Sequence, residues 1–381
     1  MGVLLLSVFG LVFIGGRGIG KPAAGQSVPA SGVWPAVAII VPASGFSVRL
    51  PECLRSILKQ DYPSFKVIFI TRDIEDPATP IIEKTIPQCS NAELILSGEA
   101  VSCGQKNHSI LAGIQALDDQ VRILVFCDST RIAPSGWLKD LVGPIITGEA
   151  SVTSGYHHAI PEDDSIAATG HAWSVLGLCM TRGIRFLIQP WGGSTAIRRD
   201  TFQKLKVEQL WAQNVVDDVS LAAHLKKNGT KVISRPGKYF TTPIVGETVG
   251  GWYRWIVRQW LYLKFCQPVS WFGAGLFCYY MSGMVILTGV LCLGGLLAWV
   301  PPIYAGYAFL FQLIFITVAG ALRFYHPRPG PLFKWIMAAY VTLMMAFWAH
   351  LTTLFSTEIH WKGIRYRVAW KGYVKEIIKT G

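Results

Sequence analysis

The sequence predicts an α/β fold, with a doubly wound and mostly parallel sheet, followed by interfacial and transmembrane helices. Short β-branched apolar runs alternate with helical segments from Val37 to Val245, an order typical of a parallel sheet covered by helices. After Val245 come three runs without Asp, Glu, Lys or Arg that are long enough to span a bilayer. With 51% hydrophobic and 15% charged residues, this chain of 381 residues is too apolar for an ordinary soluble enzyme.

Short apolar runs that end at turn residues predict the buried strands of the sheet. The predicted strands are Val37–Pro42, Phe65–Ile70, Leu94–Leu96, Ile123–Cys127 and Ser151–Gly155, and a short helix is predicted over Leu54–Gln60. Ligands of such sheets bind outside the carboxyl ends of the strands. Asp128 follows the run ILVFC directly and is therefore placed at that edge.

The composition changes along the chain predict five segments. They are a short N-terminal membrane anchor and linker (1–31), the α/β domain (32–250), an aromatic and basic interfacial helix (251–268), transmembrane helices (269–356) and a basic C-terminal tail (357–381). The loop Arg323–Lys334 is basic, which predicts a cytosolic location. Three complete spans would place the basic tail on the side opposite the α/β domain, so one run could be re-entrant.

Charge and cysteine content narrow the possible partners. The net charge of +12 suits either nucleic acid or an anionic membrane surface, and the apolar runs favour the membrane, so we expect no nucleic-acid partner. None of the eight cysteines forms a CxxC pair, which argues against a zinc site or a disulfide framework. This usage fits a catalytic part that faces the reducing cytosol.

Asp128 lies in FCDSTRIAPSGWL, where a strand-end carboxylate could hold a divalent cation that neutralises a diphosphate. Thr130 stands where an Asp-x-Asp pair would have its second carboxylate, and the alternative is an aspartate that caps a turn. Asp76, in TRDIEDPATPII, could contact the ribose or base of a nucleotide. On spacing alone, a solvated acidic loop is the better interpretation of Asp76.

Asp217 and Asp218 precede an amphipathic helical segment, VSLAAHLKKNG. Taken alone, they fit N-capping, since aspartate is favoured at helix N-termini. The functional alternative is a general base, because transfer to a hydroxyl needs a proton acceptor and adjacent carboxylates raise each other's pKa.

The segment WGGSTAIRR holds two glycines, Gly192 and Gly193, that would allow close backbone approach to a ligand, or that could form a plain turn. Arg198 and Arg199, at its end, could face phosphate or lipid headgroups. The segment RWIVRQW, from Arg254, could offer a guanidinium to a diphosphate and an aromatic plane to a sugar, or it could anchor the helix in the membrane. The histidines lack metal-ligand spacing and are predicted to be structural.

Several short motifs occur in a fixed order: IIVP, LKQDYPSFKVIF, EDPA, GQKN, CDS, WGGSTAIRRD, VDDVSLA with KKNG, and WKGIRYR. In this order they resemble the ceramide glucosyltransferase family and its bacterial relatives, within the broad family-two, GT-A-type glycosyltransferases. The resemblance runs from about Val37 to Arg367. It implies a GT-A-type sheet for the α/β domain and a sugar transfer reaction.

The resemblance also implies roles for individual residues. Asp76 would lie near the nucleotide, Lys106 near the donor, and Asp128 near the diphosphate and the metal ion, Mg²⁺ or Mn²⁺. Asp218 would be the catalytic base, and Asp217 stands where the family usually has Glu.

The fourth family motif departs from its pattern, which is Gln or Arg, two residues, then Arg-Trp. No register of Arg254, Arg258, Gln259 and Trp260 fits it, although these four remain the candidate donor contacts. The candidate acceptor region is formed by the residues Trp191, Gly192, Gly193 and Ser194.

The expected activity is an inverting, metal-dependent transfer of a hexose from a UDP-sugar to a membrane lipid hydroxyl, such as that of ceramide or diacylglycerol. Glucose is the favoured hexose. The expected protein is integral to the membrane, with its catalytic domain facing the cytosol. Two alternatives remain open: a processive polysaccharide synthase, and a non-catalytic membrane scaffold with a decayed transferase domain.

Overall fold

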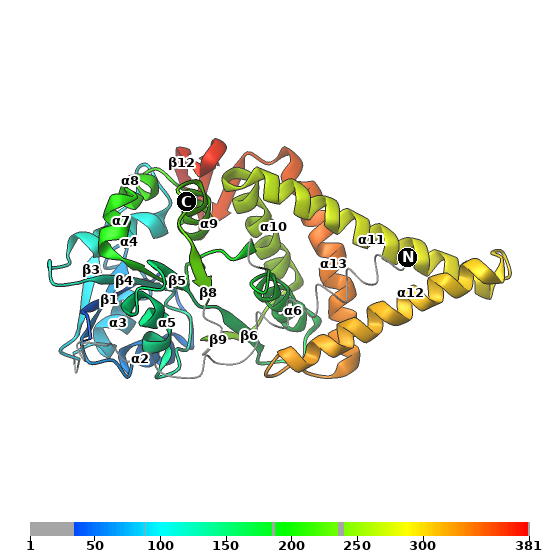
Figure 1. The fold of residues 1–381 in the computed structure, drawn as a ribbon, viewed down its shortest axis with the longest axis horizontal. Coiled ribbons are helices and arrows are strands. Elements are labelled where there is room, and N and C mark those ends of the chain that lie inside the picture. Colours follow the sequence, from blue (N-terminus) through cyan, green and yellow to red (C-terminus); the bar gives the residue numbers. More distant parts are fainter. Residues whose placement is uncertain (1–33, 88, 185–186, 235–239, 380–381) are drawn as a thin grey trace.

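The computed structural model describes residues 34–87, 89–184, 187–234 and 240–379 (Figure 1). The molecule is elongated, with the α/β domain at one end and a helical hairpin projecting from the other. The predicted anchor and linker, residues 1–31, lie outside the described residues.

A seven-stranded sheet forms the centre of the α/β domain, in the order β3-β2-β1-β4-β7-β5-β8. The strands are β1 (Val37–Pro42), β2 (Phe65–Thr71), β3 (Ala92–Leu96), β4 (Ile123–Cys127), β5 (Val152–Ser154), β7 (Ser194–Arg198) and β8 (Val232–Ser234). All neighbours pair in parallel except β7, which runs antiparallel to both β4 and β5. The predicted mostly parallel sheet is therefore confirmed.

Helices cover both faces of this sheet, and successive residues of β1 explain why. Ile39 and Val41 face the layer of α2 (Leu50–Leu58) and α5 (Trp137–Ile146), whereas Ile40 faces the opposite layer. That layer contains α4 (Gln105–Gln115), α8 (Val207–Trp211) and α9 (Asp218–Lys227). Because side chains alternate across a strand, an unbroken apolar run fills both cores at once. The remaining helices of the domain are α3 (Thr79–Thr85) and α7 (Arg199–Lys204).

A smaller layer connects the domain to the membrane helices. Strands β6 (His157–Pro161) and β9 (Phe240–Ile244) pair in parallel, and α6 (Ile166–Thr181) follows β6. The Ser165 hydroxyl accepts a hydrogen bond from the Ala168 N–H and caps α6. Helix α6 packs on the last long helix, α13 (Leu332–Phe355), so the α/β domain and the membrane helices share a packed boundary.

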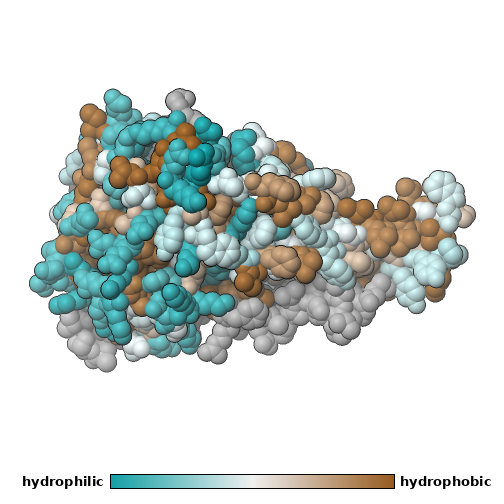
Figure 2. Space-filling model, turned by 90° about the horizontal axis from the view of Figure 1, so that it is seen from above, coloured by the Kyte–Doolittle hydropathy of each residue, from teal (hydrophilic) through white to brown (hydrophobic). Residues whose placement is uncertain are grey.

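Three of the helices in the described part of the chain are long and apolar enough to cross a membrane: α11 (Pro268–Leu296), α12 (Pro302–Ala321, with the turn to Tyr325) and α13. Helices α11 and α12 form the projecting hairpin, whose surface is largely hydrophobic (Figure 2). The predicted interfacial helix is α10 (Val249–Cys266), and Pro268 follows its end.

The basic C-terminal segment forms a three-stranded antiparallel sheet, which the sequence analysis did not anticipate. Its strands are β10 (Glu358–Trp361), β11 (Ile364–Val368) and β12 (Val374–Lys379). Ile359, Tyr366 and Val368 are buried against Leu261 of α10 and Val216 of the α/β domain. This C-terminal sheet therefore lies on the same side of the membrane helices as the α/β domain.

Candidate active site

A lysine and two aspartates meet at the carboxyl edge of the sheet. Lys106 lies in the first turn of α4, Asp128 follows β4, and Asp217 precedes α9. The Lys106 Nζ atom is 2.9 Å from Asp128 Oδ1 and 2.9 Å from Asp217 Oδ2. One ammonium thus bridges two carboxylates that lie 89 positions apart in the chain, at positions 128 and 217.

Close backbone packing holds Lys106 next to Asp217. A Cβ atom on Gly104 would lie 2.3 Å from the Val215 carbonyl oxygen, so only glycine fits there. The Gly104 N–H donates to the Asn214 carbonyl at 2.9 Å, and the Asn107 side-chain amide donates to the same oxygen at 2.8 Å. These contacts explain the GQKN motif as a structural junction between α4 and the segment before α9.

Asp218 and the turn at Gly192 form a second contact of the site. The Gly192 N–H donates to Asp218 Oδ2 at 3.1 Å, and the Val219 N–H donates to Asp218 Oδ1 at 2.7 Å. A Cβ atom on Gly192 would lie 2.2 Å from Asp217 Oδ2, so the glycine is required by close packing against that side chain, whereas the predicted approach to a ligand stays a prediction. Asp217 occupies the N-cap position of α9 without a side-chain cap hydrogen bond, so capping does not account for it.

The buried charges shift the aspartate pKa values in opposite directions. Burial and the neighbouring Asp217 charge raise the pKa of Asp218 to about 6, although Lys106 opposes the shift. For Asp128, burial alone would raise the pKa, but Lys106 and Arg131 outweigh it and hold the pKa at about 2. Two aspartates with such different pKa values suit different chemical roles.

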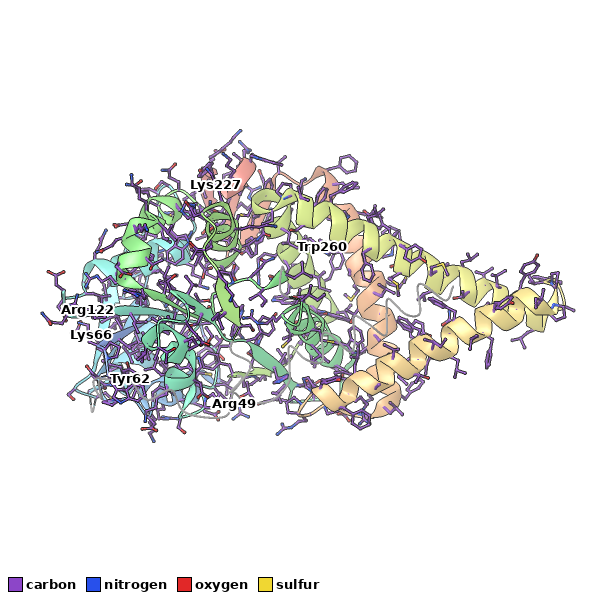
Figure 3. All side chains as sticks on the ribbon, in the orientation of Figure 1. Arg49, Tyr62, Lys66, Arg122, Lys227 and Trp260 are labelled. Carbon is purple, nitrogen blue, oxygen red and sulfur yellow. The ribbon has the colours of Figure 1, made fainter. Side chains whose placement is uncertain are left out.

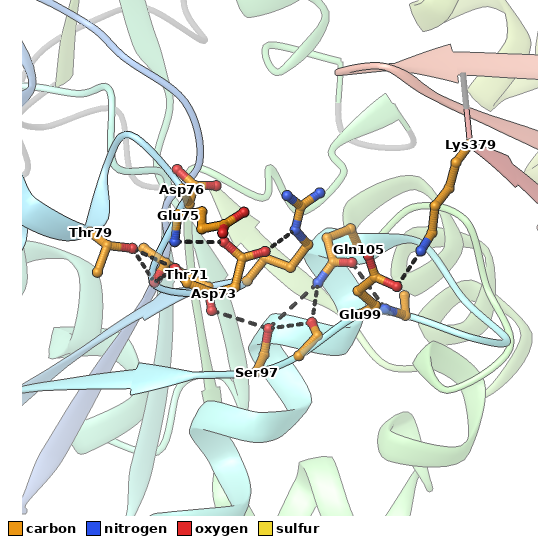
Figure 4. Close-up of polar contacts among 12 residues, drawn as sticks. Thr71, Asp73, Glu75, Asp76, Thr79, Ser97, Glu99, Gln105 and Lys379 are labelled. Atoms are coloured by element: carbon orange, nitrogen blue, oxygen red, sulfur yellow. Dashed lines mark hydrogen bonds and ion pairs between the residues drawn. The ribbon is translucent and has the colours of Figure 1, made fainter. Parts of the chain in front are cut away.

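Asp76 is 5% exposed and lies where the loops after β1 and β2 meet. Its Oδ1 atom accepts hydrogen bonds from the Gly45 N–H at 2.8 Å and the Ala78 N–H at 2.9 Å. The neighbouring Asp73 instead forms an ion pair with Arg72 at 2.6 Å (Figure 4). Asp76 is therefore a buried, positioned carboxylate, and the structure disfavours a purely solvated loop.

Arg131 is a site residue that the sequence analysis missed. Its Nη2 atom is 3.4 Å from Asp128 Oδ2, and its Nη1 donates to the Thr242 hydroxyl at 2.9 Å. The guanidinium lies 5.5 Å from the Trp191 ring centroid, and that ring stacks on His157 at 4.4 Å. The sequence did carry a signal for Arg131, because it follows Asp128 by three residues and both come directly after the predicted strand Ile123–Cys127.

The two arginines of α10 lie in different surroundings. Arg254 is exposed, and its charge acts on Glu247, which lies 2.7 Å from His171 Nδ1. Arg258 is half-buried, and its charge acts on Tyr262, which the charges of Asp217 and Asp218 also reach. Arg258 and the two carboxylates therefore act on the same side chain, Tyr262.

Other candidates lie outside this cluster. Trp260 packs its ring 4.7 Å from that of His350 in α13, on the membrane-helix side (Figure 3), and Gln259 is half-buried on α10. Ser194 is fully buried and accepts a hydrogen bond from the Trp137 indole at 2.8 Å. Gly193 packs against the ring of Trp191.

The structure contradicts a phosphate or headgroup role for Arg198 and Arg199. Arg198 pairs with Ile123, at the amino end of β4, and therefore lies at the sheet edge opposite Asp128. The Arg199 N–H donates to the Arg122 carbonyl, and Arg122 lies far from the membrane helices (Figure 3). The antiparallel direction of β7 is the reason, because it carries the end of the WGGSTAIRR segment away from the site.

The described residues contain no group of three or more His, Cys, Asp or Glu side chains able to hold a metal ion. Asp128 could still supply one carboxylate ligand, because its Oδ2 atom is engaged by Arg131 at a long distance of 3.4 Å. Mg²⁺ is commonly held by one or two carboxylates together with substrate phosphates and water.

The mostly parallel sheet, the carboxylates at its strand ends and three helices long enough to cross a membrane are the features expected of a membrane-associated GT-A-type transferase. The sequence matches Glycosyl transferase family 21 over residues 4–374, so the chain belongs to this glycosyltransferase family. The expected relationship to ceramide glucosyltransferases is thereby confirmed at the level of the family.

Two solved structures resemble the chain. The mannosyltransferase PcManGT from Pyrobaculum calidifontis, in complex with GDP-Man and Mn²⁺, has 16% identity and a TM-score of 0.50 and covers 92% of this chain and 98% of its own. The 4-diphosphocytidyl-2C-methyl-D-erythritol synthase from Anaerococcus prevotii DSM 20548 has 16% identity and a TM-score of 0.37. The match covers 52% of this chain and 86% of the synthase chain. At this identity the first likeness supports the GT-A fold alone.

Proposed function

We propose that the protein is an inverting glycosyltransferase that moves glucose, or a similar hexose, from a UDP-sugar to the hydroxyl of a membrane lipid such as ceramide or diacylglycerol. The observation that carries this proposal is the cluster of Lys106, Asp128, Asp217 and Asp218 beside α10, in which Asp217 is buried and the other three are half-buried. The cluster combines a proton acceptor with cations for a diphosphate, next to helices suited to a membrane.

In the proposed reaction, Asp218 accepts the proton of the lipid hydroxyl while the hydroxyl oxygen attacks the anomeric carbon of the sugar. The bond from that carbon to the diphosphate breaks as the new bond forms on the opposite face, so the configuration inverts. A pKa of about 6 leaves Asp218 mostly ionised at neutral pH and still basic enough to take a proton. Lys106, Arg131 and Arg258 offer positive charge to the leaving UDP.

We propose Mg²⁺ or Mn²⁺ as the cofactor, with Asp128 as its protein ligand and the donor diphosphate supplying further oxygens. The bound cation would offset the negative charge that develops on the leaving diphosphate. The likeness to a mannosyltransferase solved with Mn²⁺ supports this choice.

The metal requirement gives a direct prediction. We expect activity to be lost in excess chelator and restored by Mg²⁺ or Mn²⁺, because Asp128 and the diphosphate are both negatively charged and need a cation to offset their repulsion. Asp128→Ala should weaken UDP-sugar binding most where the metal is present, as measured by calorimetry with and without the cation. Full activity in excess chelator would contradict the proposal.

The lipid acceptor is proposed from the position of the site. The cluster faces α10, which joins directly to α11, so an acceptor hydroxyl at headgroup level would reach Asp218 while its acyl chains stay in the bilayer. The catalytic domain is proposed to face the cytosol, in keeping with the basic loop between α12 and α13.

One assay tests the whole proposal. Purified protein in mixed lipids is given UDP-glucose, other UDP-hexoses and GDP-mannose separately, and the lipid products are identified by mass spectrometry. We expect a lipid carrying a single hexose from a UDP-sugar. A polymer would favour a polysaccharide synthase, a product from GDP-mannose alone would overturn the donor, and no product with any donor would favour a non-catalytic scaffold.

A further inference from the structure

A cavity of about 260 Å³ lies between the α/β domain and the C-terminal sheet. On the domain side it is lined by Arg72, which follows β2, and by Gln105, at the start of α4. On the other side it is lined by residues of the C-terminal sheet that include Ile364, Tyr366 and Lys362. It is somewhat smaller than the roughly 300–1,000 Å³ of drug-sized ligand pockets, so it suits one part of a nucleotide sugar.

The cavity lies where a doubly wound sheet binds nucleotides. Its domain wall comes from the segments that follow β2 and β3, at the carboxyl edge of the sheet. Asp76 belongs to the same loop after β2 as Arg72, and the charges of Asp76 and of Glu99, another residue of the cavity wall, act on Arg72. The sheet edge alone leaves this region open, and the C-terminal sheet covers it.

The C-terminal sheet is attached to the elements that carry the site. The Gln105 N–H donates to the Tyr366 hydroxyl at 3.2 Å, and Lys379 forms an ion pair with Glu99 (Figure 4). Val215 lies two residues before Asp217, and its N–H donates to the Gly372 carbonyl at 2.9 Å. The sheet therefore holds a defined position over the site.

Lys362 occupies the turn between β10 and β11, where its backbone φ is 48°. Its ammonium donates to the Ser44 carbonyl in the loop after β1. Although Lys362 is exposed as a residue, protein atoms around its ammonium lower its pKa, and the charges of Asp76 and Asp128 partly offset that effect. The ammonium thus lies within electrostatic reach of both Asp76, the expected nucleoside contact, and Asp128, the expected diphosphate contact.

We propose that the C-terminal sheet completes the donor site, taking the nucleoside of the UDP-sugar into this cavity and holding its diphosphate with Lys362. The apolar and aromatic side chains of Ile364 and Tyr366 offer a surface to the base, and the Lys362 ammonium offers a point charge to a phosphate. The inference rests on the proposed function, because it takes a nucleotide sugar as the donor.

The test measures binding of UDP and of uridine to the purified full-length protein by calorimetry. Lys362→Met should weaken UDP binding roughly tenfold or more, because a hydrogen bond to a charged phosphate is lost, and should leave uridine binding unchanged. Ile377→Trp, which fills the cavity, should weaken binding of both ligands. Lys375→Met is the matched control, since Lys375 is exposed on β12 and does not line the cavity.

The outcomes separate this inference from the proposed function. If the unaltered protein does not bind UDP, the proposed donor is wrong. If it binds UDP, and Lys362→Met and Ile377→Trp bind it equally well, only the role of the C-terminal sheet is wrong. If Lys362→Met loses UDP and uridine alike at an unchanged melting temperature, Lys362 orders the cavity and the phosphate contact is overturned.

Discussion

Asp128 and Asp218 carry the same side chain, and their surroundings give them opposite properties. Asp128 contacts both Lys106 and Arg131, and the two cations hold its pKa at about 2. Asp218 lies beside Asp217 and accepts hydrogen bonds from the neutral N–H groups of Gly192 and Val219, and burial together with the Asp217 charge raises its pKa to about 6. Asp128 therefore stays ionised as an electrostatic group, and Asp218 can exchange a proton near neutral pH.

We predict that Asp218→Asn lowers transfer roughly a hundredfold or more, because an amide cannot accept the proton of the lipid hydroxyl. In the unaltered protein, the rate should rise with pH through about 6, since the raised pKa leaves Asp218 protonated and inactive as a base below that value. Turnover from pH 5 to 8 and the melting temperature are the measurements.

The control for this prediction is Asp200→Asn, because Asp200 is exposed and pairs only with Arg198 and Thr201, far from the site. Near-normal turnover of Asp218→Asn, or a rate independent of pH around 6, would remove Asp218 from the mechanism.

The different surroundings of Arg254 and Arg258 give a second prediction. Arg258→Lys should retain membrane association but lose most transfer activity, because a lysine cannot reproduce a bidentate phosphate contact. Arg254→Lys should be milder, since Arg254 is exposed and acts on Glu247. Turnover and membrane fractionation of both variants are the measurements. Equal, mild losses in both would indicate that α10 only anchors the protein.

At the scale of the helices, one lysine of α10 connects this helix to α13 through hydrogen bonds. Lys264 of α10 donates to the carbonyls of Thr353, Leu354 and Ser356, at 2.5, 3.0 and 2.9 Å. These carbonyls lie at the end of α13, where the last carbonyls of a helix lack the usual intrahelical partners, although the Ser356 N–H also donates to the Thr353 carbonyl at 3.3 Å. The positive charge also suits the negative end of the helix dipole.

We predict that Lys264→Met destabilises the protein by about 1–3 kcal/mol, because three carbonyls lose a charged donor. The measurement is thermal unfolding in detergent, where the melting temperature should fall. Lys204→Met should leave it unchanged, since Lys204 is exposed on α7, at a distance from α13. An unaltered melting temperature for Lys264→Met would mean that water satisfies these carbonyls equally well.

At the scale of the molecule, the attachment of the C-terminal sheet constrains the membrane topology. The chain leaves the α/β domain through α10, and it returns after α13 to a sheet that packs on that domain. A chain that crosses a bilayer three times ends on the opposite side, so we infer that α11, α12 and α13 do not all cross completely. This inference agrees with the expectation that one of the three apolar runs could be re-entrant.

We predict that α11 contacts lipid through residues such as Leu287, whose exposed fraction is 52%. Leu287→Arg should disfavour insertion by about 3 kcal/mol and reduce the amount of protein in the membrane fraction. Val48→Arg is the control, because Val48 is 73% exposed on the α/β domain and meets water. Equal membrane fractions for both variants would contradict a bilayer position for this part of α11.

Much of the fold follows from local patterns. The strand Ile123–Cys127 was predicted with its observed bounds, and the first two strands were predicted to within one residue. The short segments β7 and β8 and the C-terminal sheet were missed, because their half-polar sequences carry weak periodicity and are held by tertiary pairing. The expected helix at Leu54–Gln60 begins earlier, at Leu50, with Pro51 in its first turn.

The sequence by itself determined the α/β class, the membrane helices, the family and the order of its acidic motifs, because periodicity, length and motif order are properties of the chain. Only the tertiary structure decided that Lys106 joins Asp128 to Asp217, that Arg131 belongs to the site, and that Arg198 and Arg199 face away from it. It also decided that the C-terminal sheet covers a cavity at the strand ends. The physical reason is that charge pairing, burial and strand direction depend on which distant segments meet in space.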